Sequence, residues 1–369
     1  MTKRRISVEP NAPKYQQLME ILSRDILTGR YGPGQKIPSE ACLVQQFGAS
    51  RITVGRALRE LRARGLVERV AGSGTYVRRD RSGAGAMLFG LLIPDLGETE
   101  IFEPICRGMA GSPQSTGHAL LWGHTDQGTG SRSEQALQLC RQFIERGVSG
   151  VFFAPLEFGA DARETNAEIA ERLDKARIPV VLLDRDIVPY PRRSRCDLVG
   201  IDNRRAAWLA TAHLLDLATK RIAFLAHHGS APTVDARIAG YREALAASGR
   251  PELVMRLDEI DAKPVQGEIE RERPDAFVCV NDRAAAQLLQ ALSALGLRVP
   301  EDVRMVGVDD VEFASLLPVP LTTIHQPCRE IGAAAMSAML ERIARPDLLA
   351  REILLETRLV VRRSCGARP

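Results

Sequence analysis

The sequence predicts an α/β protein in two parts, a small helical head and a larger body of parallel sheets. Residues 38–77 have the pattern of two helices joined by a turn and followed by a hairpin, whereas from Met87 onward short apolar runs alternate with helical patterns. Between them, residues 78–86 are charged and then glycine-rich, which marks a linker. At 369 residues the chain is long enough for each part to bury its own core. The expected domains are therefore residues 1–77 and 87–369.

The head is expected to begin with a helix over about residues 14–28, with its apolar residues on one face. Ser39 can cap a second helix that runs to about Phe47, because its side-chain oxygen can accept a backbone N–H. Gly48 permits the backbone reversal that follows. These three signals predict a helix, a second short helix and a tight turn.

Ser50 is placed to cap a third helix, which Gly65 ends. The buried stripe of this helix consists of Val54, Ala57, Leu58 and Leu61. The residues outside the stripe, free to face a partner, are Arg51, Thr53, Arg56, Arg59 and Arg62. Residues 66–70 and 75–77 flank a tip that includes Gly74, and this pattern is typical of a β-hairpin.

A helix, a turn, an arginine-rich helix and a hairpin, in this order, make a winged helix-turn-helix, which places one helix in the major groove of DNA. An isolated arginine-rich helix would more often be a solvated face, but here the arginines begin at a helix N-terminus after a turn. Their planar side chains suit guanine edges and phosphates. Residues 1–80 contain 15 basic and 7 acidic side chains, a net charge of +8, whereas the remainder has −4. This distribution is typical of a DNA-binding head on a regulatory body.

The head resembles the N-terminal domain of the GntR family of bacterial regulators. The matching residues are Pro38-Ser39-Glu40, Phe47-Gly48, Ser50-Arg51, Thr53-Val54, Ala57-Leu58, Gly65-Leu66-Val67, Gly74-Thr75 and Val77. The resemblance implies binding to double-stranded operator DNA through Ser39, Ser50, Arg51, Thr53, Arg56 and Gly74. At Ala41 and Gly55 the chain departs from the family, which usually has arginine there, so the resemblance does not imply the operator sequence.

The body is expected to contain strands that alternate with helices. The candidate strands are residues 88–93, 119–122, 150–154, 179–183, 221–226, 276–280 and 304–308. The candidate helices are residues 133–146, 164–177, 204–216, 236–247, 284–295 and 329–343. Such alternation predicts parallel sheets covered by helices on both faces, and the length favours two lobes. A cleft between them, at the carboxyl ends of the strands, would hold a ligand.

Polar side chains close several of these strands. Asp184-Arg185, Asn281-Asp282 and Asp309-Asp310 each follow an apolar run, as does Gln326, and Arg237 begins a helix after a loop. A single aspartate at a strand end more often caps the next helix. Several such groups at one edge of the sheets favour a binding site instead. Carboxylate, amide and guanidinium groups together can fix adjacent hydroxyls of a small sugar.

The body resembles the effector domain of the LacI/GalR repressors, which is similar to periplasmic sugar-binding proteins. The matching segments are residues 178–186, 199–203, 236–241, 278–282, 299–310 and 320–327. The resemblance implies ligand contacts by Phe102, Asp184, Arg185, Arg237, Asn281, Asp309 and Gln326. The pair Asp184-Arg185 looks like the pentose-binding version of the motif. In residues 95–102 only Phe102 matches, and the helix after it, with Gly111 and Pro113, is expected to be poorly formed.

Other classes of site are not supported by the sequence. Seven cysteines without a CxxC pair argue against a disulfide framework or a zinc site. The adjacent His227 and His228 lack a third ligand, so no metal is expected, and no P-loop or GxGxxG motif supports a cofactor. Trp122 and Trp208 are expected in the core or an interface. The chain has no signal peptide and no membrane span, so we expect a cytoplasmic protein.

These features together predict a ligand-responsive transcriptional regulator, most simply a repressor, that binds operator DNA as a homodimer and a small sugar in its body. The combination resembles the arabinose-type repressors. Three alternatives stay open: a sugar-modifying enzyme with a regulatory head, a binding protein of the periplasmic type, and a regulator that responds to a nucleoside or another non-sugar effector. The sequence shows no Ser-His, Cys-His or paired-acid signature for an enzyme.

Overall fold

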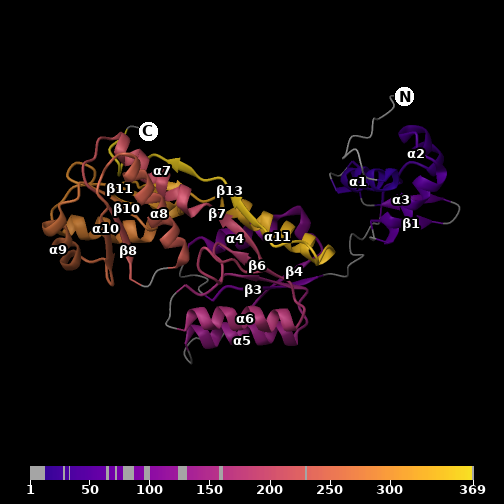
Figure 1. Cartoon of the computed structure of the whole chain (residues 1–369), viewed down its shortest axis with the longest axis horizontal. Coiled ribbons are helices and arrows are strands. Elements are labelled where there is room, and N and C mark those ends of the chain that lie inside the picture. Colours follow the sequence, from indigo (N-terminus) through magenta and orange to yellow (C-terminus); the bar gives the residue numbers. More distant parts are fainter. Residues whose placement is uncertain are drawn as a thin grey trace. The chain divides into compact units, whose positions relative to one another are not determined.

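The computed structural model of the chain describes residues 13–27, 30–32, 34–63, 66–70, 73–77, 87–94, 100–123, 131–157, 161–228 and 231–367. It divides into two compact units, Met1–Met87 and Leu88–Pro369 (Figure 1). The expected linker, residues 78–86, and the helix-ending Gly65 lie outside the described residues. We call the two units the head and the body.

The head is a three-helix unit with a hairpin. Its elements are α1 (Lys14–Leu27), α2 (Glu40–Phe47), α3 (Arg51–Ala63), β1 (Val67–Val70) and β2 (Gly74–Val77). The two strands pair antiparallel, with Val67 opposite Val77. The apolar stripe expected on α3 is buried against α1 and α2, and the core consists of Leu18, Leu22, Ile26, Ile37, Leu43, Val54, Ala57, Leu61, Val67 and Val77, among others. Because the stripe points inward, the arginines of α3 point outward.

The body consists of two lobes, each built on a sheet of six strands within the described residues. Lobe 1 has the strand order β13-β7-β6-β5-β3-β4, and all its pairs are parallel. Its elements are β3 (Leu88–Leu92), α4 (Phe102–Gly111), β4 (Ala119–Trp122), α5 (Arg132–Glu145), β5 (Gly150–Phe153), α6 (Ala162–Lys175), β6 (Val180–Leu183), β7 (Asp197–Ile201), α11 (Cys328–Ala344) and β13 (Glu352–Leu355). Figure 1 shows α5 and α6 on one face of this sheet and α4 and α11 on the other.

Lobe 2 has the strand order β14-β12-β11-β10-β8-β9. Its elements are α7 (Asn203–Asp216), β8 (Ile222–His227), α8 (Pro232–Ala247), β9 (Val254–Leu257), α9 (Ala262–Glu272), β10 (Ala276–Cys279), α10 (Asp282–Ala294), β11 (Arg304–Asp309), β12 (Thr322–His325) and β14 (Arg358–Val360). All pairs are parallel except β12–β14, which is antiparallel, so the predicted parallel sheet carries one antiparallel edge strand in this lobe.

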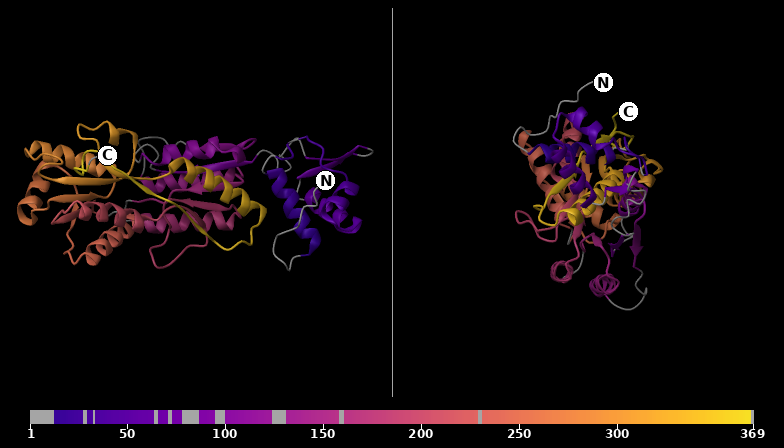
Figure 2. Two further views of the ribbon diagram at one scale, coloured as in Figure 1. Left: turned by 90° about the horizontal axis from the view of Figure 1, so that it is seen from above. Right: turned by 90° about the vertical axis from the view of Figure 1, so that its right-hand side faces the viewer.

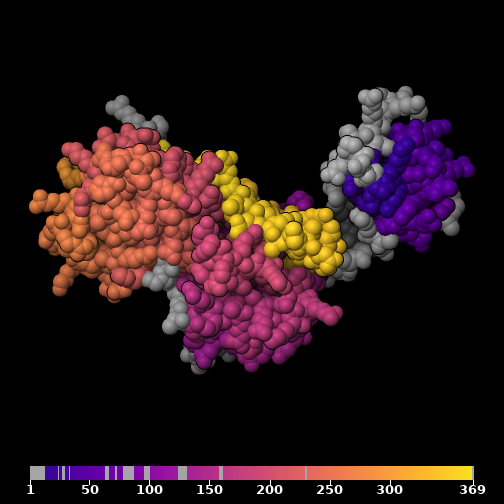
Figure 3. Space-filling model, in the orientation of Figure 1, coloured from indigo at the N-terminus to yellow at the C-terminus, as the bar shows by residue number. Residues whose placement is uncertain are grey.

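The chain passes between the lobes three times. It leaves lobe 1 after β7, returns after β12 to form α11, and leaves again between β13 and β14. Figure 2 shows the last passage as the yellow ribbon that runs from one sheet to the other, and Figure 3 shows the lobes as an orange and a magenta mass. Three connections placed side by side form a hinge of the kind that permits two lobes to close on a ligand.

The helix after Phe102 is regular, so the expectation of a poorly formed helix is wrong. A glycine lowers helix propensity, but a Cβ at Gly108 would lie 2.1 Å from the backbone oxygen of Arg329, and one at Gly332 would lie 2.0 Å from that of Ile105. The glycines therefore allow α4 and α11 to pack backbone to backbone. Strands β7, β9, β13 and β14 and helix α9 were not expected either. In α9 only Val265 is buried, so the apolar signal of this helix is weak.

Candidate DNA interface and effector cleft

The serines of the head cap helices. Ser39 Oγ accepts a hydrogen bond from the backbone N–H of Cys42 at the start of α2. Ser50 Oγ accepts one from the N–H of Thr53 at 3.1 Å and lies 2.8 Å from the Thr53 hydroxyl. Gly48 has φ 60°, the left-handed conformation that the turn requires. Ser50 and Thr53 therefore form one hydroxyl pair at the N-terminus of α3, where unpaired backbone N–H groups favour a phosphate.

The outer face of α3 carries arginines and one exposed apolar side chain. Arg51 and Arg56 are exposed, and the guanidinium carbon of Arg56 lies 3.9 Å from the centre of the Tyr15 ring on α1. This cation–π contact holds Arg56 in place without using its hydrogen-bond donors. Ile52 is 82 % exposed beside Arg51, and a Cβ at Gly55 would meet no atom within 4 Å. Tyr15 and Ile52 were not predicted from the sequence. The contact of Tyr15 with Arg56 depends on how α1 packs against α3, and a single apolar residue such as Ile52 belongs to no sequence motif.

Gly74 begins the second strand of the hairpin with φ 137°, and a Cβ there would lie 2.6 Å from Cε of Lys36. The fold itself thus requires this glycine. Lys36 also pairs with Tyr76 through an isolated bridge, and its ammonium lies 5.9 Å from the Tyr76 ring centre. Of the six residues expected to bind DNA, α3 brings Arg51, Thr53 and Arg56 onto one helix preceded by Ser50, whereas Ser39 and Gly74 belong to other elements.

In the body, two aspartates end strands in an unusual backbone conformation. Asp184 follows β6 with φ 67°, and Asp309 ends β11 with φ 121°. Non-glycine residues rarely adopt positive φ, and such residues cluster where a backbone is held for a ligand. Gly200 on β7 makes room for the first of them, because a Cβ there would lie 3.3 Å from the Asp184 backbone. The two strand ends belong to different lobes.

Arg237, buried at the start of α8, connects the lobe 2 part of the site. Its Nε donates to Asn203 Oδ1 at 2.8 Å, its Nη1 donates to the Val280 carbonyl at 2.5 Å, and its Nη2 lies 3.8 Å from Asp309 Oδ1. Gln326 Nε2 donates to the same Asp309 oxygen at 2.6 Å. Three of the expected residues, Arg237, Asp309 and Gln326, therefore form one network.

Arg185 connects the lobe 1 part. Its Nη1 lies 2.7 Å from Glu157 Oε2 and its Nε lies 3.3 Å from Asp184 Oδ2. Its guanidinium carbon lies 5.8 Å from the ring centre of Phe102. Asp184 Oδ1 is buried and has no hydrogen-bond partner among the described residues. A buried carboxylate oxygen without a partner is costly, and a ligand hydroxyl would satisfy it.

The electrostatics join the two parts. Burial raises the pKa of Asp184, and Arg185 and Arg237 oppose this shift. Burial also raises the pKa of Asp309 to about 7, although Arg237 and Gln326 lower it, and the charge of Asp184 raises it further. Asp184 and Asp309 belong to opposite lobes, and the charge of Arg237 stabilises the ionised form of both. The carboxylates in this arrangement can accept hydrogen bonds from several hydroxyl groups, and the guanidinium groups can donate hydrogen bonds to them.

One of the expected residues, Asn281, and its neighbour Asp282 make structural hydrogen bonds within the protein. Asn281 Oδ1 accepts from the N–H of Ala284 and caps α10, which is the ordinary role of an amide at a strand end. The neighbouring Asp282 is fully buried and accepts from Thr323 Oγ1 at 2.6 Å and from the N–H of Val311 at 3.0 Å, so it holds the fold together. Ligand contact by Asn281 stays a prediction.

A cavity of about 820 Å³ opens between the lobes. Of the seven expected effector residues, Asp184 and Arg185 line it, whereas Phe102, Arg237, Asn281, Asp309 and Gln326 do not. Glu157, Asn203 and Arg204 line it as well. Asn203 was not singled out from the sequence, although it closes the segment 199–203 that carried part of the family resemblance.

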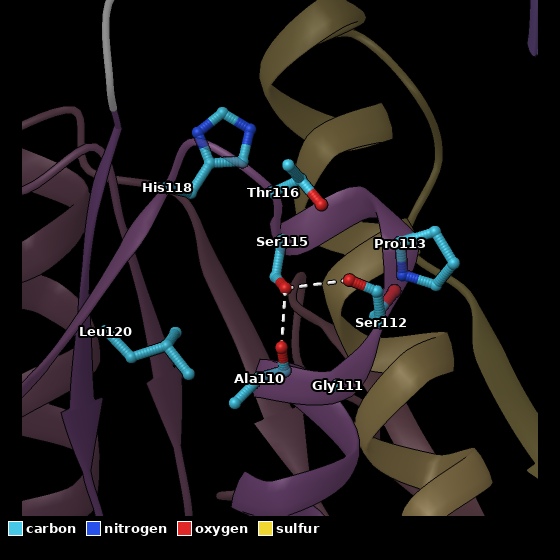
Figure 4. A pocket seen from close by; sticks show the side chains of 8 residues that line it. All are labelled: Ala110, Gly111, Ser112, Pro113, Ser115, Thr116, His118 and Leu120. Carbon is cyan, nitrogen blue, oxygen red and sulfur yellow. Dashed lines mark hydrogen bonds between the residues drawn. The ribbon is translucent and has the colours of Figure 1, made fainter.

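A second hollow, of about 420 Å³, lies at the end of α4 (Figure 4). Its hydroxyls serve the local turn: Ser115 Oγ donates to the carbonyls of Ala110 and Ser112, and Ser112 caps the short 3₁₀-helix Pro113–Ser115. No residue of the two expected sites lines it. Within the described residues, no cluster of three histidine, cysteine, aspartate or glutamate side chains could hold a metal ion, and no helix is long and apolar enough to span a membrane.

Comparisons with known proteins agree with this architecture. Residues 14–77 match the model of bacterial regulatory proteins of the gntR family, and residues 211–365 match that of the periplasmic binding protein-like domain. The chain is 30 % identical to an arabinose metabolism transcriptional repressor of Geobacillus stearothermophilus, over 96 % of this chain and 98 % of that one.

Two solved structures are similar as well. The first is a LacI family transcriptional regulator from Enterococcus faecium with bound ribose, at 25 % identity and a TM-score of 0.62, covering 75 % of this chain and 98 % of that one. The second is the complex of the transcriptional regulator CelR with cellobiose, at 25 % identity and a TM-score of 0.64, covering 86 % of this chain and 91 % of that one.

Proposed function

Because this chain belongs to the transcriptional repressors that join a gntR-type winged helix to a periplasmic-binding-protein-like domain, we propose that it is a repressor whose hold on operator DNA changes when a sugar binds in the body. One observation carries the effector part of the proposal. Asp184 and Asp309, from opposite lobes, interact with the buried Arg237, and Asp184 keeps one oxygen without a partner. The compartment of such a regulator is the cytoplasm, where its DNA lies.

A sugar fits these groups better than an ion or an apolar molecule. Two carboxylates, an amide and two guanidinium groups supply acceptors and donors for neighbouring hydroxyls. The ribose complex and the arabinose repressor among the similar proteins support a pentose. A pentose is the effector class that we assign to the cleft.

DNA binding is assigned to α3 and the hairpin. Arg51 lies exposed at the start of α3, where a recognition helix meets base edges, and Arg56, further along the helix, is held on the Tyr15 ring. Ser50 and Thr53 would contact a phosphate at the helix N-terminus. Gly74 would let the hairpin approach the minor groove.

We assign no enzymatic reaction to the cleft. Covalent catalysis would need an activated nucleophile in the cleft. Burial raises the pKa of the Cys328 thiol beside the cleft, and Asp309 and Asp184 raise it further, so this thiol stays protonated at neutral pH. A protonated thiol is a poor nucleophile.

We propose that two bodies pair to form a homodimer. Strand β4 is an edge strand of the lobe 1 sheet, and Trp122 on it is 55 % exposed. Exposed aromatic side chains on a strand edge are typical of an interface between subunits. The sequence is compatible with Trp122 in the core or in an interface, and its exposure favours the interface. A Trp122→Glu protein should elute as a monomer in size-exclusion chromatography, and retention of the wild-type size would contradict this assignment.

A dimer would link the two functions. Two heads on one dimer would bind the two halves of a palindromic operator. Closure of the lobes by a sugar would change how the heads are placed. Only a sugar with different affinities for the DNA-bound and the free conformations can drive this change.

Two measurements test the proposal. Thermal shifts of the full-length protein with arabinose and ribose should grow with sugar concentration and disappear in Arg237→Ala and Asp309→Ala. Binding to promoter duplexes from the neighbouring genes should fall steeply with salt and be lost in Arg51→Ala, but not in Arg141→Ala, which removes an exposed arginine of α5 in the body. Wild-type behaviour of both cleft variants would remove the sugar assignment, and wild-type DNA binding of Arg51→Ala would remove the role of α3.

A further inference from the structure

The cavity between the lobes is lined by two of the seven expected effector residues, Asp184 and Arg185, and extends away from them. Asp184 and Arg185 are only 8 % and 4 % exposed, so they mark its inner end and make it polar. Its outer part is bounded by the loop after β6, by β13 and by the start of α8. The apolar side chains that line this outer part are Ile187, Val188, Pro189, Tyr190, Pro232 and Leu354. The cavity is therefore amphipathic, with one end suited to hydroxyls and the other to carbon.

Two large side chains of the outer part are open to solvent. Tyr190 is 89 % exposed and Leu354 is 47 % exposed. They come from segments far apart in the chain, and few other large apolar side chains of the described body are as exposed. Exposed apolar surface at the mouth of a cavity is typical of a site that a ligand covers.

Most charged groups that line the cavity already have partners on the protein. Glu352 pairs with Arg193 at 3.0 Å, and Asp235 pairs with Arg256 at 3.1 Å. Arg204 donates to Glu243, Asp186 accepts the N–H groups of Val188 and Ser194, and Asp202 caps α7. The remaining charged side chains of the outer part, Arg163, Glu164 and Arg192, are exposed to solvent. The outer part thus offers an occupant apolar surface and no buried charge, whereas the buried side chains of Asp184 and Arg185 supply the polar groups at the inner end.

We propose that the effector is a glycoside whose sugar binds at Asp184 and Arg185 and whose apolar, aromatic aglycone lies along Tyr190 and Leu354. The proposal rests on the sugar-responsive function and names the class of sugar derivative that the same cleft takes. A tyrosine ring can stack on an aromatic aglycone, and the leucine covers its edge. A free pentose would fill the inner end and leave the outer part to water.

Isothermal titration of the full-length protein with a matched series of ligands tests this proposal. The series consists of ribose and arabinose, their methyl glycosides and their phenyl glycosides, each as both anomers. For the sugar that binds, the phenyl glycoside should bind roughly tenfold more tightly than the methyl glycoside, because the ring covers apolar surface that the methyl group does not reach. Tyr190→Ala should remove this advantage and leave the affinity for the methyl glycoside unchanged. Leu354→Ala should remove part of it.

Leu349→Ala is the matched control. Leu349 is 87 % exposed in the same body but does not line the cavity, so this variant should keep the full advantage of the phenyl glycoside. Equal affinity for phenyl and methyl glycosides, or an advantage that survives Tyr190→Ala, overturns the proposal and leaves the sugar-responsive function intact. If no ligand of the series binds, the sugar-responsive function and the glycoside proposal both fall.

Discussion

Replacement of Asp309 by asparagine is expected to stabilise the protein at alkaline pH far more than at acidic pH. The carboxyl group is buried at the end of β11, and this burial raises its pKa to about 7 against the pull of Arg237 and Gln326. In an unfolded chain an aspartate ionises near pH ~3.9. Between these two values the folded protein keeps a proton that the unfolded chain has lost. The stability of the wild type therefore falls as the pH rises from about 4 to 7, and it levels off above pH 7 because both states are then ionised.

The size of the effect follows from the gap between the two pKa values. A gap of about three units corresponds to roughly 4 kcal/mol of unfolding free energy. Compared with a neutral asparagine, the wild type loses about 1–2 kcal/mol of unfolding free energy at pH 5 and about 4 kcal/mol at pH 8. Asparagine keeps an acceptor for Gln326 and has the shape of the aspartate that already adopts the φ of 121° at this position. The advantage of the variant should therefore grow by roughly 2–3 kcal/mol from pH 5 to pH 8.

Urea unfolding of both proteins at pH 5, 6, 7 and 8, without sugar, measures this difference. Asp302→Asn is the control of opposite sign, because Arg298 lowers the pKa of Asp302 to about 2. Asp302 contributes stability above pH ~4 that is lost only as the pH falls towards 2, so the effect of this substitution stays constant from pH 5 to 8. A difference between Asp309→Asn and the wild type that is flat or shrinks over the same range would refute the reasoning.

Three further predictions concern the helices. Gly108→Ala should destabilise the body by at least ~2 kcal/mol in urea unfolding, because the new Cβ would lie 2.1 Å from the backbone of α11, whereas Gly111→Ala in the same helix meets no atom within 4 Å and should not destabilise it. Gly55→Ala should slow hydrogen exchange in α3 about fivefold, since alanine favours a helix by ~1 kcal/mol, and Gly48→Ala, at φ 60°, should speed exchange in the head. Ile52→Ala should make DNA binding insensitive to at least one thymine-to-deoxyuridine replacement that weakens wild-type binding roughly fourfold. The reason is that Ile52 is 82 % exposed beside Arg51, and an exposed apolar side chain on a recognition helix would pack on a thymine methyl group. A wild-type protein indifferent to every such replacement would contradict this last prediction.

The parts of the fold that were predictable are those whose signal is local. The stripe of α3 repeats at helical spacing, and the buried strands β5, β6 and β10 are continuous apolar runs, so neither depends on knowing what packs against it. Helix α4 could not be predicted, because its glycines lower its helix propensity and only the close packing against α11 explains them. Strands β13 and β14 are short edge strands whose pairing joins distant parts of the chain.

The candidate site divides in the same way. The sequence predicts polar side chains at the strand ends, because the apolar runs stop there. Examples are Asp184, Asp309 and Gln326. Sequence patterns do not show that Arg237 contacts both Asn203 and Asp309, because these residues lie on segments far apart in the chain. They also do not show that Asn281 caps a helix. The contact of Arg56 with Tyr15 is of the same kind.

The order of residues alone therefore determined a winged helix-turn-helix followed by strands and helices with polar strand ends, because hydrophobic periodicity and capping act over a few residues. Which of those polar groups meet, which oxygen is left without a partner, and where the cavity opens were decided by the three passages between the lobes. These passages bring distant segments together, and burial then changes their charge and their hydrogen bonds.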